Sequence, residues 1–484
     1  MEESLKYYLE NTLVTNEAIN SRLTHPITNL KYPPRVVGDL LIKYSIDFFK
    51  SGLEPRFISL VGLRGVGKTT LLWQTANYIQ SNHSENIYFF NVNTLKNLGV
   101  SLQVALEEFQ KHILKKRFIE STEPIVLLFD EVQEDDNWAM TLKILYDEAR
   151  WAFILCSGSS ALLLNNTADL ARRMHTEKIL PFSLTEFIRS KVYLEKEGLM
   201  IVLENDFSNS LKEALLFSEN GEIASAKIKV ITPIITKYFS AVEFSYNNQF
   251  EDWVTEYIHY RNIPKYLLYN NQTAVNNSFV ELIKQIIYED IPQLKPSFSD
   301  YSKVEKLLLR LAGSDEINPE KLAGIIGVKQ QEINELIDIL AKAELLNVLM
   351  PYGGLDSKIT KNKKAFFMSP SIRRALLSTL YGQDLPEHFN SKLLEDIVVM
   401  YLRRILIDGI ISFTSGNENV NPDFVIETRD LPIILEVGTG KLNAKQILSS
   451  KINFRYGILI SNGFTEPVLK DNVIYLPLSW FLLL

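Results

Sequence analysis

The sequence predicts an α/β protein with several domains, and three apolar segments predict a parallel sheet in its first half. Residues 57–61 (FISLV) indicate a short strand, and a helical pattern follows over 69–79. Residues 125–129 (IVLLF) are apolar throughout, as is typical of a central parallel strand that is covered on both faces. A third apolar segment occupies 152–156 (AFILC). Strands that alternate with helices in this way predict a parallel sheet.

The stretch 62–70 (GLRGVGKTT), which joins the first strand to its helix, carries the most specific pattern in the chain. It matches G-x-x-x-x-G-K-[ST], in which glycines let backbone N–H groups point at phosphate oxygens. The lysine adds a mobile positive charge, and the threonine hydroxyl is a ligand for Mg²⁺. The alternative, a tight turn in an unrelated α/β protein, fits the strand–loop–helix order less well. We expect ATP and Mg²⁺ to bind here, with contacts from Gly62, Arg64, Gly65, Val66, Gly67, Lys68, Thr69 and Thr70.

Two acids, Asp130 and Glu131, directly follow the second strand. The carboxyl ends of parallel strands meet at one edge of the sheet, where α/β proteins bind ligands. At that edge we expect Asp130 to hold Mg²⁺ together with Thr69, and Glu131 to orient and polarise the attacking water. The alternative is a solvated acidic loop, because Glu134, Asp135 and Asp136 follow closely.

Polar residues also follow the third strand. Ser157 and Ser159 are candidates to sense the γ-phosphate, and the alternative is that a serine caps the next helix. Further on, Arg172 and Arg173 precede the segment 180–187 (LPFSLTEF). An arginine here could stabilise transition-state charge in its own subunit or in a neighbouring one. The alternative is a pair of surface arginines.

Four segments in this order, GLRGVGKTTLL, LLFDEVQ, ILCSGSSALLL and LARRMHTEKILPFSLTEF, resemble prokaryotic AAA-type ATPases near the origin-recognition and STAND-like signalling branches. The resemblance covers most of the chain and is strongest over 35–190. It implies an AAA-type core, a helical lid, a winged helix and a C-terminal restriction-endonuclease-like α/β domain. It also favours Arg173 over Arg172, so that the expected catalytic residues are Lys68, Asp130, Glu131 and Arg173.

The resemblance and the composition shifts divide the chain into six parts. In order, these are an N-terminal helical extension (1–34), the AAA-type core (35–190), an insertion of unknown role (191–250), a helical lid (251–300), a winged helix (301–384) and a PD-(D/E)xK nuclease-like domain (385–484). Within the insertion, residues 227–235 (KIKVITPII) suggest a strand broken by Pro233. In the lid, Arg261 is either a phosphate contact or a surface arginine.

The winged helix is predicted from helix-turn-helix spacing over 303–351. Asn318 and Pro319 cap its second helix, and Gly327 turns the chain into the third. The exposed side chains of that third helix are neutral or acidic, which disfavours phosphate contacts; they are Gln330, Gln331, Glu332, Asn334, Glu335 and Asp338. A basic cluster in the wing could instead grip DNA nonspecifically: Lys358, Lys361, Lys363 and Lys364. The alternatives are a packing module and a solvated loop.

The last part of the chain carries two strand-associated acids, Asp423 and Glu436, at the spacing of the PD-(D/E)xK fold. Two carboxylates on one divalent ion would hold a phosphodiester oxygen and activate water. Glu395, in a predicted helix over 393–407, could add a third carboxylate. The pattern asks for lysine at position 438, where this chain has glycine, and a lysine could reach in from Lys441 or Lys445. The alternatives are an inactivated fold used for binding, and two acids that share no ion.

Composition excludes several classes of protein. The net charge of −7 argues against a generally basic DNA-coating protein, and the single cysteine, Cys156, excludes a disulfide framework. With six scattered histidines, we expect no zinc site. The start MEESLKYYLE lacks the features of a signal peptide, and no run of about 18 apolar residues occurs, so we expect a cytoplasmic protein without a membrane partner.

We therefore expect Mg-dependent ATP binding and hydrolysis to drive a conformational switch that controls the nuclease-like domain. Because of Gly438, we expect that domain to be impaired in cleavage and used for binding. The alternatives are an ATP-driven DNA-processing nuclease, for defence or a mobile element, and a STAND-like scaffold that self-assembles or binds a protein partner.

Overall fold

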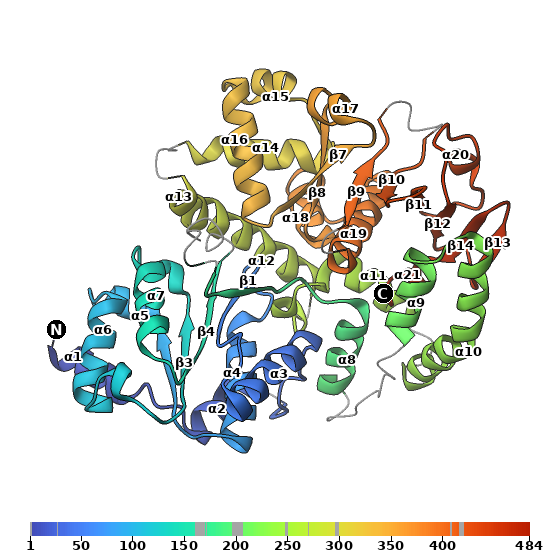
Figure 1. Ribbon diagram of the computed structural model, residues 1–484. Helices are drawn as coiled ribbons and strands as arrows, with labels where there is room; N and C mark the ends of the chain where they lie inside the picture. Colours follow the sequence, from blue (N-terminus) through green and yellow to red (C-terminus); the bar gives the residue numbers. More distant parts are fainter. Residues whose placement is uncertain are drawn as a thin grey trace. The chain divides into compact units, whose positions relative to one another are not determined.

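The computed structural model describes residues 2–26, 28–159, 170, 172–195, 207–246, 250–269, 271–295, 300–406, 409–415 and 421–484. The chain forms two compact units (Figure 1). Unit 1 comprises Met1–Leu180 and Ser190–Leu199, and unit 2 comprises Pro181–Arg189 and Met200–Leu484. In the described parts of both units, no helix is long and apolar enough to cross a membrane.

Unit 1 is built on a five-stranded parallel sheet with the strand order β2-β3-β4-β1-β5. The strands are β1 (Phe57–Val61), β2 (Ile87–Asn91), β3 (Ile125–Asp130), β4 (Ala152–Gly158) and β5 (His175–Lys178). Every residue of β1, β3 and β4 is buried, which explains why these three segments are so apolar. The three strands predicted from the sequence are therefore confirmed.

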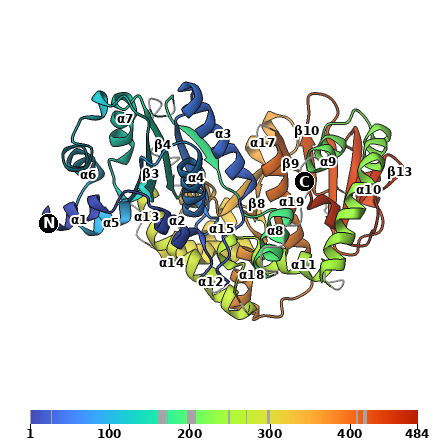
Figure 2. The ribbon, with the colours of Figure 1, turned by 90° about the horizontal axis from the view of Figure 1, so that it is seen from below.

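Helices cover both faces of this sheet (Figures 1 and 2). One face packs against α1 (Glu2–Glu10), α5 (Val92–Asn97), α6 (Leu102–Phe109) and α7 (Trp138–Glu148) in a single apolar cluster. The other face is covered by α2 (Asn16–Leu23), α3 (Val36–Ser51) and α4 (Lys68–Asn82). The N-terminal segment belongs to this unit, because the Val14 N–H donates to the Ile87 carbonyl at 2.8 Å.

The part of unit 2 that precedes its sheet is helical. Its helices include α9 (Phe207–Leu216), α10 (Gly221–Tyr246), α11 (Phe250–Glu256), α12 (Gln272–Gln285) and α13 (Ile291–Leu294), and α8 (Leu184–Glu195) contains residues of both units. The strand expected over 227–235 is wrong, because α10 is one helix of 26 residues with Pro233 inside it. Ile228, Ile231 and Ile235 are buried while Val230 is exposed, so the apolar residues follow the helical period.

A nine-stranded sheet organises the rest of unit 2, in the order β13-β14-β12-β11-β10-β9-β7-β8-β6. The strands are β6 (Glu316–Ile317), β7 (Leu346–Pro351), β8 (Lys363–Phe367), β9 (Ile410–Phe413), β10 (Phe424–Glu427), β11 (Ile433–Gly438), β12 (Tyr456–Ser461), β13 (Val468–Lys470) and β14 (Val473–Pro477). The parallel pair β7 and β9, with Met350 opposite Ser412, joins the predicted wing region to the predicted nuclease-like region. These two regions therefore share one sheet.

The predicted helices of the 301–384 region are present. They are α14 (Tyr301–Gly313), α15 (Pro319–Ile326) and α16 (Gln330–Lys342), followed after β7 by α17 (Leu355–Thr360) and, after β8, by α18 (Pro370–Tyr381). The Asn318 side chain accepts from the Lys321 N–H at the start of α15, and Gly327 ends that helix with a positive φ of 78°. Helix α19 (Phe389–Ile405) and the short helices α20 (Lys445–Leu448) and α21 (Leu478–Phe481) complete the unit.

A buried ion-pair network connects α18, α19 and the segment between α14 and β6 with β8. The fully buried Arg373 lies 2.6 Å (Nε to Oδ2) from Asp396 and 2.7 Å (Nη1 to Oδ1) from Asp315. Lys392 pairs with the second oxygen of Asp315 at 2.7 Å. Asp396 also accepts the backbone N–H of Phe367 on β8 at 2.8 Å. Each buried charge in the network has a partner of opposite sign.

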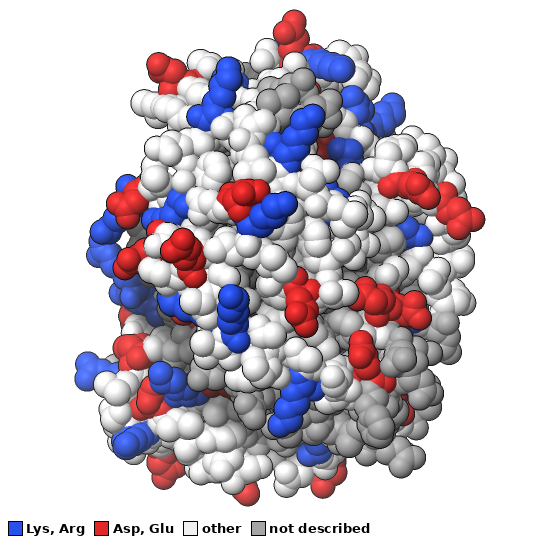
Figure 3. Space-filling view, turned by 90° about the vertical axis from the view of Figure 1, so that its right-hand side faces the viewer, with Lys and Arg blue, Asp and Glu red and all other residues white. Residues whose placement is uncertain are grey.

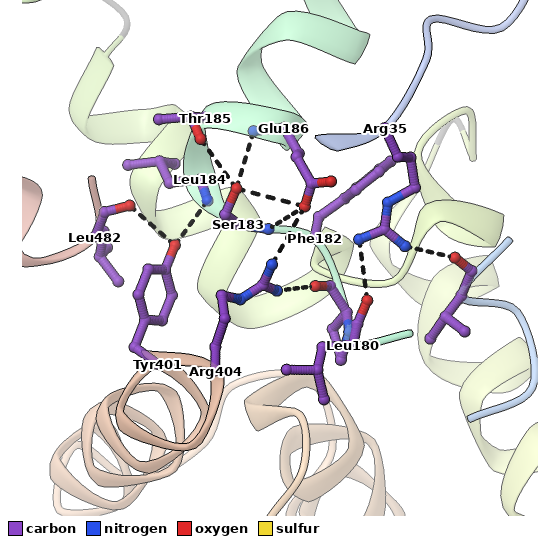
Figure 4. Close-up of polar contacts among 12 residues, drawn as sticks. Arg35, Leu180, Phe182, Ser183, Leu184, Thr185, Glu186, Tyr401, Arg404 and Leu482 are labelled. Carbon is purple, nitrogen blue, oxygen red and sulfur yellow. Dashed lines mark hydrogen bonds and ion pairs between the residues drawn. The ribbon is translucent and has the colours of Figure 1, made fainter. Parts of the chain in front are cut away.

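The first residues of unit 2 are fixed by side chains of α19 (Figure 4). The Tyr401 hydroxyl accepts the Leu184 N–H at 2.7 Å and donates to the Leu482 carbonyl at 2.9 Å. Arg404 donates to the Pro181 carbonyl and pairs with Glu186 at 3.5 Å. These contacts hold the start and the end of the unit together.

Charges of both signs are interspersed on the face of the molecule drawn in Figure 3. This mixture agrees with the composition, in which 51 lysines and arginines stand beside 58 aspartates and glutamates. Such a surface favours solubility over broad electrostatic attraction of one ligand type.

Candidate functional site

The loop between β1 and α4 has a backbone that only glycine can form at key positions. Gly65 and Gly67 have φ angles of 85° and 93°, in the left-handed region. A Cβ on Gly62 would lie 2.3 Å from the Ile179 carbonyl oxygen, so any side chain there would clash with backbone. A Cβ on Gly67 would meet nothing within 4 Å, which indicates open space beside the start of α4.

Lys68 lies inside this loop and is only 6% exposed. Its Nζ donates to the carbonyl oxygens of Gly62 at 2.9 Å and Leu63 at 3.1 Å. Because α4 begins at this residue, the positive end of the helix dipole adds to the lysine charge. The loop therefore offers a preformed positive site for an anion.

Thr69, Asp130 and Ser157 meet at the end of β3. The Thr69 hydroxyl lies 3.0 Å from each carboxylate oxygen of Asp130. Ser157, in the adjacent strand β4, donates its hydroxyl to the same carboxylate. Burial raises the pKa of Asp130, and the hydrogen bond from Ser157 opposes that shift. Ser157 thus supports the carboxylate, where the sequence suggested a contact with phosphate.

Glu131 has an unusual backbone and a partner that sequence reasoning missed. Its φ of 56° and ψ of 47° are left-handed, a conformation that non-glycine residues adopt mainly at functional sites and turns. The Gln133 amide donates to the Glu131 carboxylate, and the Ser159 N–H donates to the Gln133 carbonyl oxygen at 3.2 Å. The Ser159 hydroxyl is buried without a hydrogen-bond partner. This orphaned donor fits a ligand beside Glu131.

Arg35 is a second residue that sequence reasoning missed, because it lies far from the glycine loop in the chain. Its Nη1 donates to the Val66 carbonyl at 2.7 Å, and its Nη2 donates to the Leu180 carbonyl at 3.0 Å (Figure 4). The side chain is buried. Arg35 therefore fixes the tip of the loop to the last residue of unit 1's first segment.

Arg173 does not reach the loop of its own subunit, and that part of the prediction is wrong. Its Nε pairs with Asp147, near the end of α7, at 2.8 Å. It precedes β5, whose first residue, His175, pairs with Ile58, whereas Lys178 pairs with Val61 beside the loop. Arg173 therefore lies at the opposite edge of the sheet from the phosphate site. Action toward a neighbouring subunit stays a prediction.

A second polar cluster lies in unit 2 around β10 and β11. Lys441 pairs with Oε1 of Glu436, which is only 1% exposed, while Oε2 of Glu436 is buried without a hydrogen-bond partner. Asp423, directly before β10, accepts the Val437 N–H at 2.8 Å. A Cβ on Gly438 would lie 2.9 Å from Cδ of Lys441, so the glycine leaves room for that side chain. Of the two candidate lysines, Lys441 is the one that reaches in, and Lys445 is exposed.

The acids of this cluster have pKa values that are raised by burial and by one another's charge. Burial raises the pKa of Asp423 to about 7, with a further contribution from the charge of Glu436. Burial likewise raises the pKa of Glu436 to about 7, against the effect of Lys441. The pKa of Glu395, on α19, is raised well above its usual value by burial and by Asp315 and Asp423. Within the described ranges, however, no three His, Cys, Asp or Glu side chains are grouped to hold a metal, so Glu395 does not complete a triad with Asp423 and Glu436.

Two basic residues singled out from the sequence have structural partners. Lys358 lies 2.8 Å from both carboxylate oxygens of Glu427, so its charge is neutralised within the fold. Arg261 pairs with Glu256 at 2.8 Å and donates to the Leu267 and Tyr269 carbonyls. A phosphate contact for Arg261 is therefore not supported. Two other lysines of the wing cluster, Lys361 and Lys364, line a cleft.

Comparisons with known proteins give relatives for most of the chain. An uncharacterized protein of Methanocaldococcus jannaschii, MJ1637, is 29% identical over 453 residues, which cover 92% of this chain and 88% of the relative. Another from the same organism, MJ1544, is 29% identical over 175 residues, covering 35% and 37% of the two chains. A family model described as "Domain of unknown function (DUF8612)" matches residues 252–383.

Solved structures of remote similarity include two DNA-associated proteins. The Aeropyrum pernix ORC1 protein in complex with DNA is 14% identical, with 78% of this chain and 98% of that chain covered and a TM-score of 0.34. The Thermotoga maritima RuvB Holliday junction branch migration motor is 14% identical, with 72% and 95% covered and a TM-score of 0.28.

A family model described as "AAA domain" matches residues 54–188, which include β1, the glycine loop, the two acids at the end of β3 and the two serines at the end of β4. The five parallel strands of unit 1 form the sheet that such a domain requires. This part of the chain is therefore an AAA-type P-loop domain.

Proposed function

We propose that unit 1 binds Mg-ATP in the loop 62–70 and hydrolyses it. The observation that carries the proposal is that Lys68, Thr69 and Asp130 lie together at the glycine loop. The loop has open space beside Gly67 for a ligand. Thr69 and Asp130 supply adjacent hard oxygen donors, which are the ligands that Mg²⁺ prefers. The buried, unpartnered hydroxyl of Ser159 adds a donor for a ligand at the same strand edge. The AAA domain match supports this assignment.

Each residue has a distinct role in this proposal. Lys68 and the N–H groups of the loop bind the β- and γ-phosphates, and Asp130 is held in place by Ser157 and Thr69. Bound Mg²⁺ would neutralise phosphate charge. Glu131 orients the attacking water and polarises it, and Gln133 fixes the direction of the Glu131 carboxylate. Arg35 stabilises the loop through the Val66 carbonyl.

Replacing Lys68 with alanine tests nucleotide binding. We expect the Kd for ATP to rise by at least about 100-fold, or ~2.7 kcal/mol, because the phosphates lose their buried cation. Isothermal titration calorimetry with ATP and Mg²⁺ measures this. The exposed Lys50 on α3, replaced by alanine, is the matched control and should bind as the wild type does. Equal affinity in the Lys68→Ala protein would refute the assigned site.

We also propose that ATP turnover drives a conformational switch in this protein, and that the switch controls a PD-(D/E)xK-like region over 385–484. The observation in favour of a PD-(D/E)xK-like region is the position of Lys441, whose side chain lies against Gly438 and pairs with Glu436. In this proposal Lys441 takes the role of the lysine that the pattern expects at position 438. This arrangement favours the second candidate function, metal-dependent phosphodiester cleavage, with Asp423 and Glu436 as the ligands of one divalent ion.

Supercoiled plasmid incubated with the full chain, Mn²⁺ or Mg²⁺, and ATP tests this second function. We expect slow nicking that is lost in Glu436→Gln and in Lys441→Ala, because the first removes a metal ligand and the second removes the cation beside it. Gel electrophoresis measures the fraction nicked. An intact plasmid in a reaction that still consumes ATP would instead mean that the region only binds, or that the chain is a signalling scaffold.

A further inference from the structure

A cleft of about 630 Å³ lies in unit 2 between the end of the wing and the end of β9. One wall comes from the start of β8 and the residues before it, with Lys361, Asn362 and Lys364. The other wall is formed by Phe413 and Ser415. All of these residues belong to unit 2. Lys364 and Phe413 lie in strands β8 and β9 of its sheet, and the others are next to the ends of these strands.

The two lysines are positioned by contacts across the cleft. Lys361 donates to the Ser415 hydroxyl at 2.9 Å. The Lys364 ammonium lies 5.5 Å from the centre of the Phe413 ring. Glu316 also lines the cleft, and its carboxylate accepts a hydrogen bond from the Asn362 amide at 2.7 Å. The lining therefore presents two cations in fixed positions, with less side-chain entropy to lose when an anion binds.

The cleft adjoins the acids that the second proposed function uses. Phe413 pairs across the sheet with Phe424, which directly follows Asp423. The charge of Lys364 lowers the pKa of Asp423, Glu395 and Asp315, so this cleft residue lies within electrostatic range of all three acids. The lining thus carries two positive groups and the hydrogen-bonded Glu316. Asp423 lies next to Phe424, the strand partner of the wall residue Phe413. A nucleic-acid backbone matches this arrangement. One phosphate would bind the lysines, and the next would bind a divalent cation held by the acids.

We propose that this cleft binds the sugar–phosphate backbone of a nucleic-acid strand and leads it toward Asp423 and Glu436. Helix α16 is disfavoured as the contact, because its exposed face carries Glu332, Glu335 and Asp338. The phosphate contacts with Lys361 and Lys364 do not depend on ATP hydrolysis. Only the last step, at the acids, rests on the proposed metal pair.

Fluorescence anisotropy with the full-length protein tests the cleft. The probes are a fluorescein-labelled 20-nucleotide DNA strand, an RNA of the same sequence, and the DNA duplex. Each is titrated in EDTA and in Ca²⁺, which takes oxygen ligands. We expect the Lys361→Ala/Lys364→Ala protein to bind at least about tenfold more weakly in both conditions. Its slope of log K against log salt should fall by about 1.4–1.8, as two lost phosphate contacts require.

Two further variants separate the possible explanations. Lys329→Ala/Lys342→Ala removes two exposed lysines at the ends of α16 and should bind as the wild type does. Asp423→Asn/Glu436→Gln should lose only the gain in affinity from Ca²⁺. Undiminished binding by the cleft variant, or a loss confined to the α16 variant, would overturn the proposal. A loss in the cleft variant without any Ca²⁺ gain in the wild type would support the cleft and count against the metal pair. The tighter of the DNA and RNA probes identifies the strand type.

Discussion

Glutamine in place of Glu131 is expected to leave ATP binding intact and to lower the turnover rate by about 100-fold or more. The carboxylate lies at the carboxyl edge of the sheet, next to Asp130, and Gln133 fixes its direction. An amide can still accept the hydrogen bond from Gln133, but it cannot take a proton from water. A general base contributes about 10²–10⁴-fold to a rate, which sets the size of the effect.

A steady-state phosphate-release assay, with calorimetry for binding, measures the two quantities separately. Asp136→Asn is the matched control, because Asp136 belongs to the same acidic loop but is exposed. Its turnover should equal that of the wild type. If the Glu131→Gln protein turned over ATP at the wild-type rate, another residue would have to activate the water. A loss of ATP affinity in that variant would show that Glu131 has a structural role in the site.

Asparagine in place of Asp396 is expected to destabilise unit 2 by about 3–5 kcal/mol, because it leaves the buried Arg373 without its bidentate partner. Asp396 and Arg373 are both 0% exposed, and Asp396 lies 2.6 and 2.8 Å from two nitrogens of the guanidinium. Asp315 still faces the arginine, but it is shared with Lys392. The variant therefore has one buried positive charge in excess.

Native-state amide hydrogen exchange is the suitable measurement, because a chain with two units need not unfold in one step. The free energy of opening measured for amides in β8 and α19 should fall by about 3–5 kcal/mol. The double variant Arg373→Met/Asp396→Leu removes both charges and should lose less than the sum of the two single variants. Additive losses would show that the pair contributes no coupling energy, and unchanged protection in Asp396→Asn would contradict the argument. Since β8 carries Lys364, the same variant should also weaken strand binding in the cleft.

The phosphate loop and its strand-end partners were predictable because the chemistry is local. Strand, glycine loop and helix are contiguous, and parallel strands deliver Asp130 and Ser157 to one edge whatever their separation in the chain. Gln133 had a weak signal, two residues after Glu131. Arg35 had none, because it donates to carbonyls that are 31 and 145 positions away. Every residue has a backbone carbonyl, so the sequence does not indicate which ones a side chain will contact.

The errors have physical causes as well. β-branched residues around Pro233 suggested a strand, but the burial of Ile228, Ile231 and Ile235 along one helix face determined the structure. The choice between Lys441 and Lys445 depended on the space above Gly438, which the spacing of residues does not specify. The partner of Arg173, Asp147, lies 26 positions earlier, and only the fold shows that this pair stands at the far edge of the sheet.

The pairing of β7 with β9 means that the match to residues 252–383 does not delimit a body that can exist alone. A polypeptide cut after residue 383 would lose six strands of the sheet, β9 to β14, and would expose the backbone edge of β7. An exposed strand edge promotes aggregation. It would also lose Asp396 and Lys392, so that the buried Arg373 would keep only the carboxylate of Asp315 as an ion-pair partner. Recombinant fragments of this protein therefore need to extend through Leu482, Leu483 and Leu484, which are buried.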